Sequence, residues 1–180
     1  MRHLPNIICL LRIALVWPII VALQQHNHSL ALALFMLASV SDGLDGWLAK
    51  RFNWTSELGK VLDPVADKLL LMAVFLVCTW QGLIPRWLTV AAVARDVMIG
   101  LGAVAFMVGW GPLRGRPMLA SKVNTLLQLL YVLMVIIHAG FGLPSQGVLD
   151  AMAVVTLLTV LLSGFGYLRE FTGRALRMAG

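Results

Sequence analysis

The sequence predicts an all-α integral membrane protein, a bundle of six transmembrane helices with both termini in the cytoplasm. Of its 180 residues, 60% are hydrophobic and only 12% are charged, whereas a soluble globular domain is nearer a quarter charged. The apolar residues form six stretches, each close to the roughly 20 residues that cross a bilayer. Basic residues alternate between successive connections. This composition excludes an ordinary soluble domain, a disordered chain and a nucleic-acid-binding module.

The six predicted spans are separated by glycine, proline and polar residues, which interrupt apolar helices. They cover residues 7–23, 29–48, 61–80, 88–108, 119–139 and 148–168. A chain of this length fills one compact bundle. We therefore expect a single membrane domain over residues 1–180.

The orientation follows from the basic residues of the connections. Lys50, Arg51 and Lys60 lie in the second connection, and Arg114, Arg116 and Lys122 lie in the fourth; the first and fifth connections have none. Cytoplasmic connections carry the excess of lysine and arginine, so both termini and these two connections are predicted to be cytoplasmic. The net charge of +6 reflects this asymmetry rather than a polyanionic partner. The short chain and its charged connections favour a bacterial inner membrane.

Four of the eight acidic residues fall within 26 positions, at the cytoplasmic ends of the second and third spans: Asp42, Asp45, Asp63 and Asp67. A carboxylate at the membrane centre costs about 2.5–3.5 kcal/mol on insertion scales, so four carboxylates close together indicate a functional site. The spacings i, i+3 and i, i+4 place each pair on one helix face. Two divalent cations would neutralise the four charges, and hard oxygen ligands select Mg²⁺, Mn²⁺ or Ca²⁺ over zinc.

Glycines are interleaved with these acids at Gly43, Gly46 and Gly59. Small residues in membrane helices often only allow helices to pack closely. Three of them beside the acids suggest instead a slot for a ligand that carries phosphate. Two cations beside such a slot suit a phosphoryl displacement, because they stabilise both the attacking and the leaving oxygen.

The acids and glycines together resemble the signature of the CDP-alcohol phosphatidyltransferase family, D-x2-D-G-x2-A-R-x8-G-x3-D-x3-D. The matching positions are Asp42, Asp45, Gly46, Ala49, Gly59, Asp63 and Asp67. One position departs from the signature, since Lys50, followed by Arg51, stands where the family has arginine. Lysine keeps the charge but loses the bidentate fork of arginine. Pro5, Asn6 and Arg12 are similar to the opening of the family's sequences.

The resemblance implies a six-helix membrane enzyme of phospholipid biosynthesis, commonly a homodimer, with its active site facing the cytoplasm. Such an enzyme transfers a phosphatidyl group from CDP-diacylglycerol to an alcohol and releases CMP. By the matching positions, Asp42, Asp45, Asp63 and Asp67 would bind two Mg²⁺ or Mn²⁺ ions. Asp67 would also be the general base for the acceptor hydroxyl. The CDP site would comprise Gly46, Ala49, Lys50, Arg51 and Gly59, with Asn6 and Arg12 as further candidates.

Shorter similarities point to the branch of the family with glycerol-type acceptors. The run 63–68 resembles both phosphatidylglycerophosphate synthases and cardiolipin synthases of the eukaryotic type, whereas the runs 94–97 and 121–125 are more similar to the latter. We therefore expect phosphatidylglycerol as acceptor, which gives cardiolipin. The alternative acceptor is glycerol 3-phosphate, which gives phosphatidylglycerophosphate. The alternative of another class is a divalent-cation transporter that uses the acid cluster.

Other charged residues admit two interpretations each. Arg95 and Asp96 are either an ion pair that joins helices or, for Arg95, a ligand of the acceptor phosphate. Arg114, Arg116 and Lys122 either set the topology and attract anionic lipid or bind the acceptor phosphate, for which Lys122 and Asn124 are best placed. Arg12 is expected either to extend toward the cytoplasmic surface or to reach the nucleotide.

Overall fold

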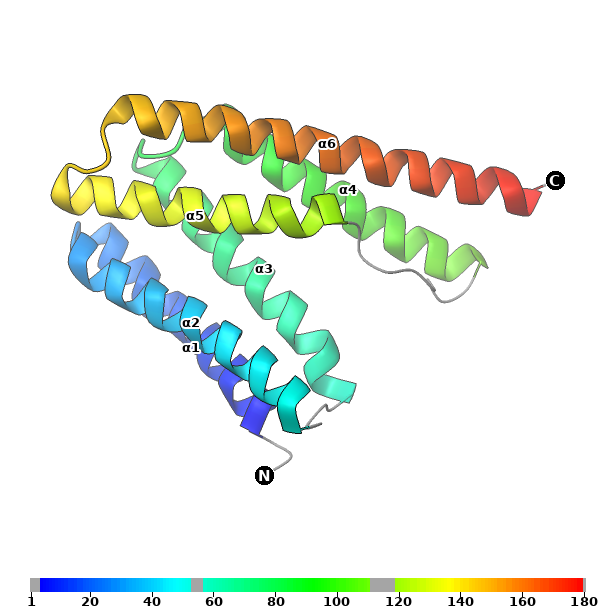
Figure 1. Ribbon diagram of the computed structural model, residues 1–180, viewed down its shortest axis with the longest axis horizontal. Coiled ribbons are helices and arrows are strands. Elements are labelled where there is room, and N and C mark those ends of the chain that lie inside the picture. Colours follow the sequence, from blue (N-terminus) through cyan, green and yellow to red (C-terminus); the bar gives the residue numbers. More distant parts are fainter. Residues whose placement is uncertain (1–3, 53–56, 111–118, 180) are drawn as a thin grey trace. The chain divides into compact units, whose positions relative to one another are not determined.

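The computed structural model describes the backbone of residues 4–52, 57–110 and 119–179 and the side chains of residues 10–41, 66–105, 109, 119–170, 172 and 173. The described residues form six helices and no strand, which confirms the predicted all-α class (Figure 1). The helices are α1 (Leu4–Gln24), α2 (His28–Phe52), α3 (Glu57–Trp80), α4 (Arg86–Trp110), α5 (Leu119–Phe141) and α6 (Gln146–Ala179). Helix α6 continues beyond the predicted span because its last residues, though polar, still favour helix.

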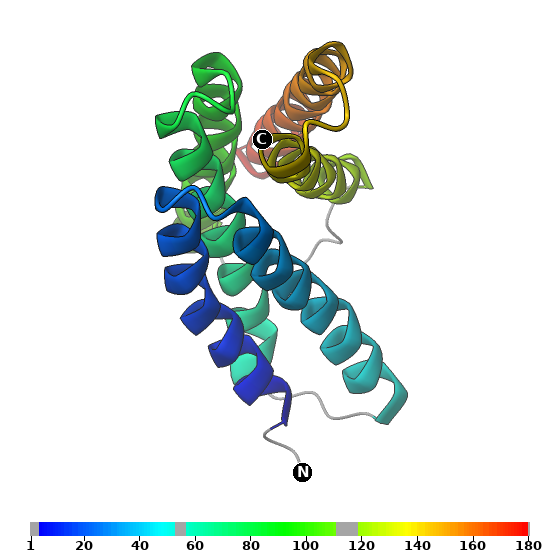
Figure 2. The ribbon, with the colours of Figure 1, turned by 90° about the vertical axis from the view of Figure 1, so that its left-hand side faces the viewer.

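Contacts divide the chain into two compact units, and one of the boundaries between them falls inside α5. The first unit comprises Met1–Ile84 and Val132–Ser145, and the second comprises Pro85–Tyr131 and Gln146–Gly180. In the first unit α1 packs against both α2 and α3 (Figure 1, Figure 2). In the second unit α4 packs against α6.

The core of the first unit is built from one face of each helix. Buried positions on α3 recur every four residues, at Ala66, Leu70, Val74 and Cys78. Those on α2 follow the same helical period, at Ala31, Phe35 and Ala38. Four of these side chains are alanine or cysteine, so the helices approach closely. Near the start of α2, Gly140 of α5 also allows a close approach, since a Cβ there would lie 3.1 Å from the Cβ of His28.

The second unit buries polar side chains beside apolar ones and exposes many large apolar side chains. Polar side chains are buried on α5 and α6, among them Asn124, Thr156 and Ser163, while Leu162 and Phe165 are 67% and 68% exposed. In water this arrangement would expose a large apolar surface, whereas in lipid it satisfies both faces. Among the described residues, Arg86–Ala105, Leu119–Phe141 and Gln146–Glu170 are long and apolar enough to cross a membrane. The chain is therefore an integral membrane protein.

Two helices of the first unit end in the same capping motif. At the end of α1, the amide of His26 donates to the carbonyl of Leu23, and that of Asn27 to the carbonyl of Ala22, both at 2.9 Å. At the end of α3, Gly82 and Leu83 donate in the same pattern to Thr79 and Cys78, at 3.0 and 2.8 Å. This pattern is the Schellman motif, whose turn residue takes a left-handed conformation.

The two motifs differ in the residue at that turn position. Gly82 has φ +76° without strain, but His26 has φ +55°, where its Cβ meets the following carbonyl. Asn27 then begins α2 by accepting a hydrogen bond from the amide of Leu30 through its side chain, at 3.1 Å. Histidine at position 26 thus costs stability that glycine would not.

We predict that His26→Gly raises the free energy of unfolding by about 0.5–1 kcal/mol, because it relieves the left-handed strain. Gly82→Ala, whose added Cβ meets nothing within 4 Å, should lower it by about 1 kcal/mol through strain alone. Denaturant-induced unfolding in mixed micelles measures both changes. A lower midpoint for His26→Gly would show that the imidazole itself stabilises the fold.

Candidate active site

The backbone of the predicted acidic cluster is helical, as expected. Asp42 and Asp45 lie in the C-terminal part of α2, with Gly46, Ala49, Lys50 and Arg51, while Gly59, Asp63 and Asp67 lie in the N-terminal part of α3. Both segments belong to the first unit. The side chains at 42–51, 59 and 63 lie outside the described residues, as does that of Asn6. Among the four aspartates, the described side chain is that of Asp67.

Asp67 contacts an arginine from a helix distant in the sequence. The Arg12 Nη1 of α1 donates to Oδ1 of Asp67, and the two form an ion pair. The Arg12 side chain is only 1% exposed, whereas that of Asp67 is 36% exposed. The expectation that Arg12 extends toward the surface is therefore wrong. Its guanidinium is buried within the bundle, where Asp67 supplies the nearby anion that a buried cation needs.

This geometry gives Asp67 two properties useful in a reaction site. Arginine stabilises the ionised carboxylate and, as a planar donor, holds it in one orientation. Because about a third of the Asp67 side chain remains exposed, a proton or a cation can still reach it.

A divalent cation fits the chemistry of these residues, since hard carboxylate oxygens are the ligands that Mg²⁺ and Mn²⁺ prefer. Within residues whose side chains the structure describes, no three metal-ligating groups gather. Of the four aspartates, only Asp67 is covered by this search. The side chains of Asp42, Asp45 and Asp63 lie outside the described residues. The four-aspartate metal site therefore stays a prediction.

A second buried arginine organises the other unit. Arg95 on α4 is 5% exposed and donates to Asp96 Oδ1 at 2.6 Å and to Ser121 Oγ at 2.7 Å. It also donates to Ser163 Oγ on α6, and its guanidinium lies 5.9 Å from the centre of the Tyr167 ring. Arg95 thus connects α4, α5 and α6. The sequence reasoning missed Ser163 and Tyr167, although polar residues with helical spacing in an apolar span were a usable signal.

The residues expected to bind the acceptor are not all brought together. Lys122 is exposed on α5, whereas Asn124 is fully buried and accepts a hydrogen bond from Thr159 of α6 at 3.2 Å. Residues two apart point in different directions from a helix, so these two cannot face one ligand side by side. Arg114 and Arg116 lie outside the described residues. Of this set, Arg95 and Asn124 face the interior of the second unit.

Comparison with known proteins identifies the family of the chain. The family model of CDP-alcohol phosphatidyltransferases matches residues 2–163. The cardiolipin synthases (CMP-forming) of Rattus norvegicus and Homo sapiens are each 31% identical over 182 residues, 91% of this chain and 60% of theirs. The CDP-diacylglycerol–glycerol-3-phosphate 3-phosphatidyltransferase of Bacillus subtilis is 31% identical over 93% of this chain and 94% of its own.

The chain thus spans about 60% of the length of the two mammalian relatives and nearly all of the bacterial one. The matched region contains every helix that carries a predicted site residue. The chain therefore belongs to the CDP-alcohol phosphatidyltransferase family.

Proposed function

We propose that the protein transfers a phosphatidyl group from CDP-diacylglycerol to a glycerol-type alcohol and releases CMP. The observation that carries this proposal is the Arg12–Asp67 ion pair, in which a buried arginine holds the last aspartate of the family signature in a partly exposed position. The family match and the names of the relatives support the same reaction class. The divalent-cation transporter has no comparable support.

The reaction needs a base, an anchor for the nucleotide and charge neutralisation. Asp67 takes the proton of the acceptor hydroxyl, whose oxygen then forms a bond to the phosphorus that bears diacylglycerol. The bond from that phosphorus to the oxygen shared with CMP breaks, and CMP leaves. Lys50 and Arg51 stabilise the charge of the nucleotide phosphates, while Arg12, the further candidate at the nucleotide, is buried and holds Asp67 in place. Gly46, Ala49 and Gly59 leave room for the nucleotide. Asn6, near the start of the chain, is a further candidate ligand of the nucleotide.

Asp42, Asp45, Asp63 and Asp67 would hold two Mg²⁺ or Mn²⁺ ions. Bound there, the ions would withdraw charge from the diphosphate and stabilise the leaving oxygen. The aspartates come from two helices, so their carboxylates can approach one ligand from two sides. The chain contributes the rest of the positive charge through Lys50 and Arg51, which lie beyond Asp45 toward the C-terminal end of α2.

The proposed membrane placement has six spans, with both termini and the active site in the cytoplasm of a bacterium and the protein in its inner membrane. It is supported by the basic connections and by the six helices among the described residues. At this surface the acyl chains of the substrate stay in lipid while CDP stays in water. A single domain that forms a homodimer completes the proposed organisation.

The proposed acceptor is phosphatidylglycerol. A cardiolipin synthase of Streptomyces coelicolor is 38% identical over 53% of this chain, which supports that choice. Glycerol 3-phosphate is the second candidate, because the Bacillus subtilis relative matches nearly from end to end. Both acceptors carry a glycerol hydroxyl and a phosphate, so Arg95 is a candidate ligand for either.

Asp67→Asn is expected to lower the rate of CMP release at least about 100-fold, because the amide cannot take the acceptor proton. Radiolabelled CDP-diacylglycerol in mixed micelles measures this rate. Arg12→Gln is the matched variant, since it breaks the same ion pair but keeps the carboxylate. It should raise the KM for CDP-diacylglycerol and keep measurable turnover. If both variants lose turnover only in proportion to their lost stability, the assignment of Asp67 as base is wrong.

Arg95→Lys is expected to lower the free energy of unfolding by about 1.5–3 kcal/mol, since one ammonium cannot reach Asp96, Ser121 and Ser163 together. Ser163→Ala, which removes one of these bonds, should cost about 1 kcal/mol. If Arg95 also binds the acceptor phosphate, Arg95→Lys raises the KM for the acceptor while the KM for CDP-diacylglycerol stays constant. An unchanged acceptor KM would restrict Arg95 to a structural role.

The acceptor is tested with purified protein, CDP-diacylglycerol and Mn²⁺ or Mg²⁺, with each alcohol supplied separately. We expect cardiolipin with phosphatidylglycerol, and complete loss of product after chelation, reversed by adding back either cation. Product with glycerol 3-phosphate and none with phosphatidylglycerol would establish the second candidate instead. Cation flux into liposomes without CDP-diacylglycerol would favour the transporter.

A further inference from the structure

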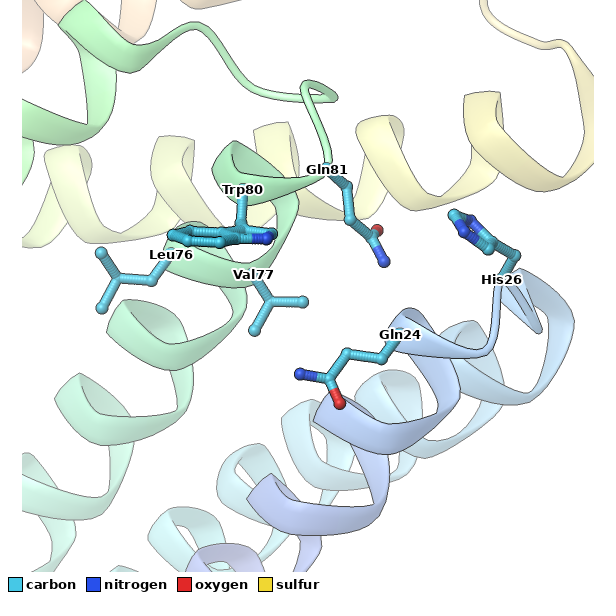
Figure 3. Close-up of a pocket in the computed structure, with 6 residues that line it drawn as sticks. All are labelled: Gln24, His26, Leu76, Val77, Trp80 and Gln81. Carbon is cyan, nitrogen blue, oxygen red and sulfur yellow. The ribbon is translucent and has the colours of Figure 1, made fainter.

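A pocket of about 470 Å³ lies in the first unit, at the end of the helices away from the aspartates (Figure 3). Its lining consists of Gln24 and His26 at the end of α1, and Leu76, Val77, Trp80 and Gln81 at the end of α3. Asp45 is 17 residues along α2 from His28, which corresponds to about 26 Å of helix. The pocket is therefore separate from the proposed active site.

The lining divides into a polar rim and an apolar wall. Gln24, His26 and Gln81 supply amide and imidazole groups at the helix ends, while Leu76 and Val77 lie about one turn further into α3 (Figure 3). The Trp80 side chain is 92% exposed, and tryptophan is enriched where membrane meets water. The lining contains no carboxylate, lysine or arginine. The volume is within the usual range for small-molecule sites, roughly 300–1,000 Å³.

Two contacts preorganise this rim. The Gln81 Nε2 donates to the carbonyl of Leu23 at 2.6 Å, which joins the end of α3 to the end of α1. The Schellman motif of α1 then places His26 in its left-handed turn. Within the described part of the chain, the side chains of Gln24, His26 and Trp80 make no hydrogen bond, so their N–H groups are available to a ligand.

The presence of histidine at position 26 supports a ligand site independently of the pocket's shape. The same turn at Gly82 uses the residue that the left-handed conformation favours, whereas His26 is strained there. Strained residues that a fold retains are concentrated at functional sites. The imidazole at this position lines the pocket, and a glycine would not.

We propose that this pocket binds the headgroup of a membrane phospholipid in the leaflet opposite the aspartate ends of α2 and α3. The phosphodiester accepts hydrogen bonds from the N–H groups of His26, Trp80 and Gln24. The first methylene groups of the lipid lie against Leu76 and Val77. These N–H donors contact the phosphodiester, which is common to phospholipids with different headgroups, so phosphatidylethanolamine, which is not the proposed acceptor, is a suitable probe.

The test measures retention of phosphatidylethanolamine by the full chain in a neutral detergent, using native mass spectrometry. His26→Gly, which keeps the cap, and Trp80→Phe, which keeps a ring but removes the N–H, should each weaken binding about tenfold, the loss of one charge-assisted hydrogen bond. Gln25→Ala is the matched control, because Gln25 is an exposed neighbour in the same turn and is not part of the lining. It should bind as the unmodified chain does.

Two further probes test whether binding needs both the phosphodiester and the acyl chains of the lipid. Diacylglycerol, which lacks the phosphodiester, and inorganic phosphate, which lacks the chains, should each fail to displace the lipid. Equal binding by the unmodified chain, His26→Gly and Trp80→Phe would overturn the proposal, as would full displacement by either probe. Asp67→Asn should retain the lipid, so failure of the proposed enzyme activity leaves this test unaffected.

Discussion

The structure depends on one constraint: a charge that enters an apolar helix bundle must find a partner there. Arg12 and Arg95 are the two buried cations among the described residues, and each contacts an aspartate. An unpaired ion in this environment would cost several kcal/mol, so neither partner can be removed without a consequence for the other. The two pairs lie in different units: Arg12 and Asp67 are on different helices, whereas Arg95 and Asp96 are neighbours on α4. Arg12 connects α1 to α3, while Arg95 connects α4 to α5 and α6.

The same constraint explains why the second unit is polar inside. Asn124, Gln128, Thr156 and Ser163 are all buried, at positions that recur with helical period on α5 and α6. Lipid offers no hydrogen bonds, so these groups are satisfied best between helices, and there they hold α5 to α6. Apolar side chains such as Leu88, Leu149 and Val160 are buried beside them, while others, among them Leu162 and Phe165, are exposed. Stability and membrane insertion are thus provided by the two opposite faces of the same helices.

The fold could be predicted well from the sequence, because hydrophobic stretches and breakers depend on local composition. The C-terminal ends of α1, α3 and α5 were predicted within two residues, but the starts of α1 and α3 and the end of α6 were not, since hydropathy does not register the polar turns of a helix. In the site, the acid spacing predicted which helix ends carry the aspartates. It could not predict that Arg12 contacts Asp67, or that Arg95 reaches Ser163, because these contacts join residues 55 and 68 positions apart. The hydrophobic pattern of a single helix does not specify which distant residue its polar side chains contact.

The two ends of the first unit illustrate how one small bundle can have two chemistries. Where α2 ends and α3 begins, the chain concentrates carboxylates and basic residues, which suit a charged, water-soluble nucleotide. Where α1 and α3 end, it places amides, an imidazole and an indole, which suit the neutral boundary of a bilayer. The helices between are long enough to keep these groups apart, so neither set perturbs the charge of the other. A strained histidine is tolerated at the neutral end because the capping hydrogen bonds around it remain complete.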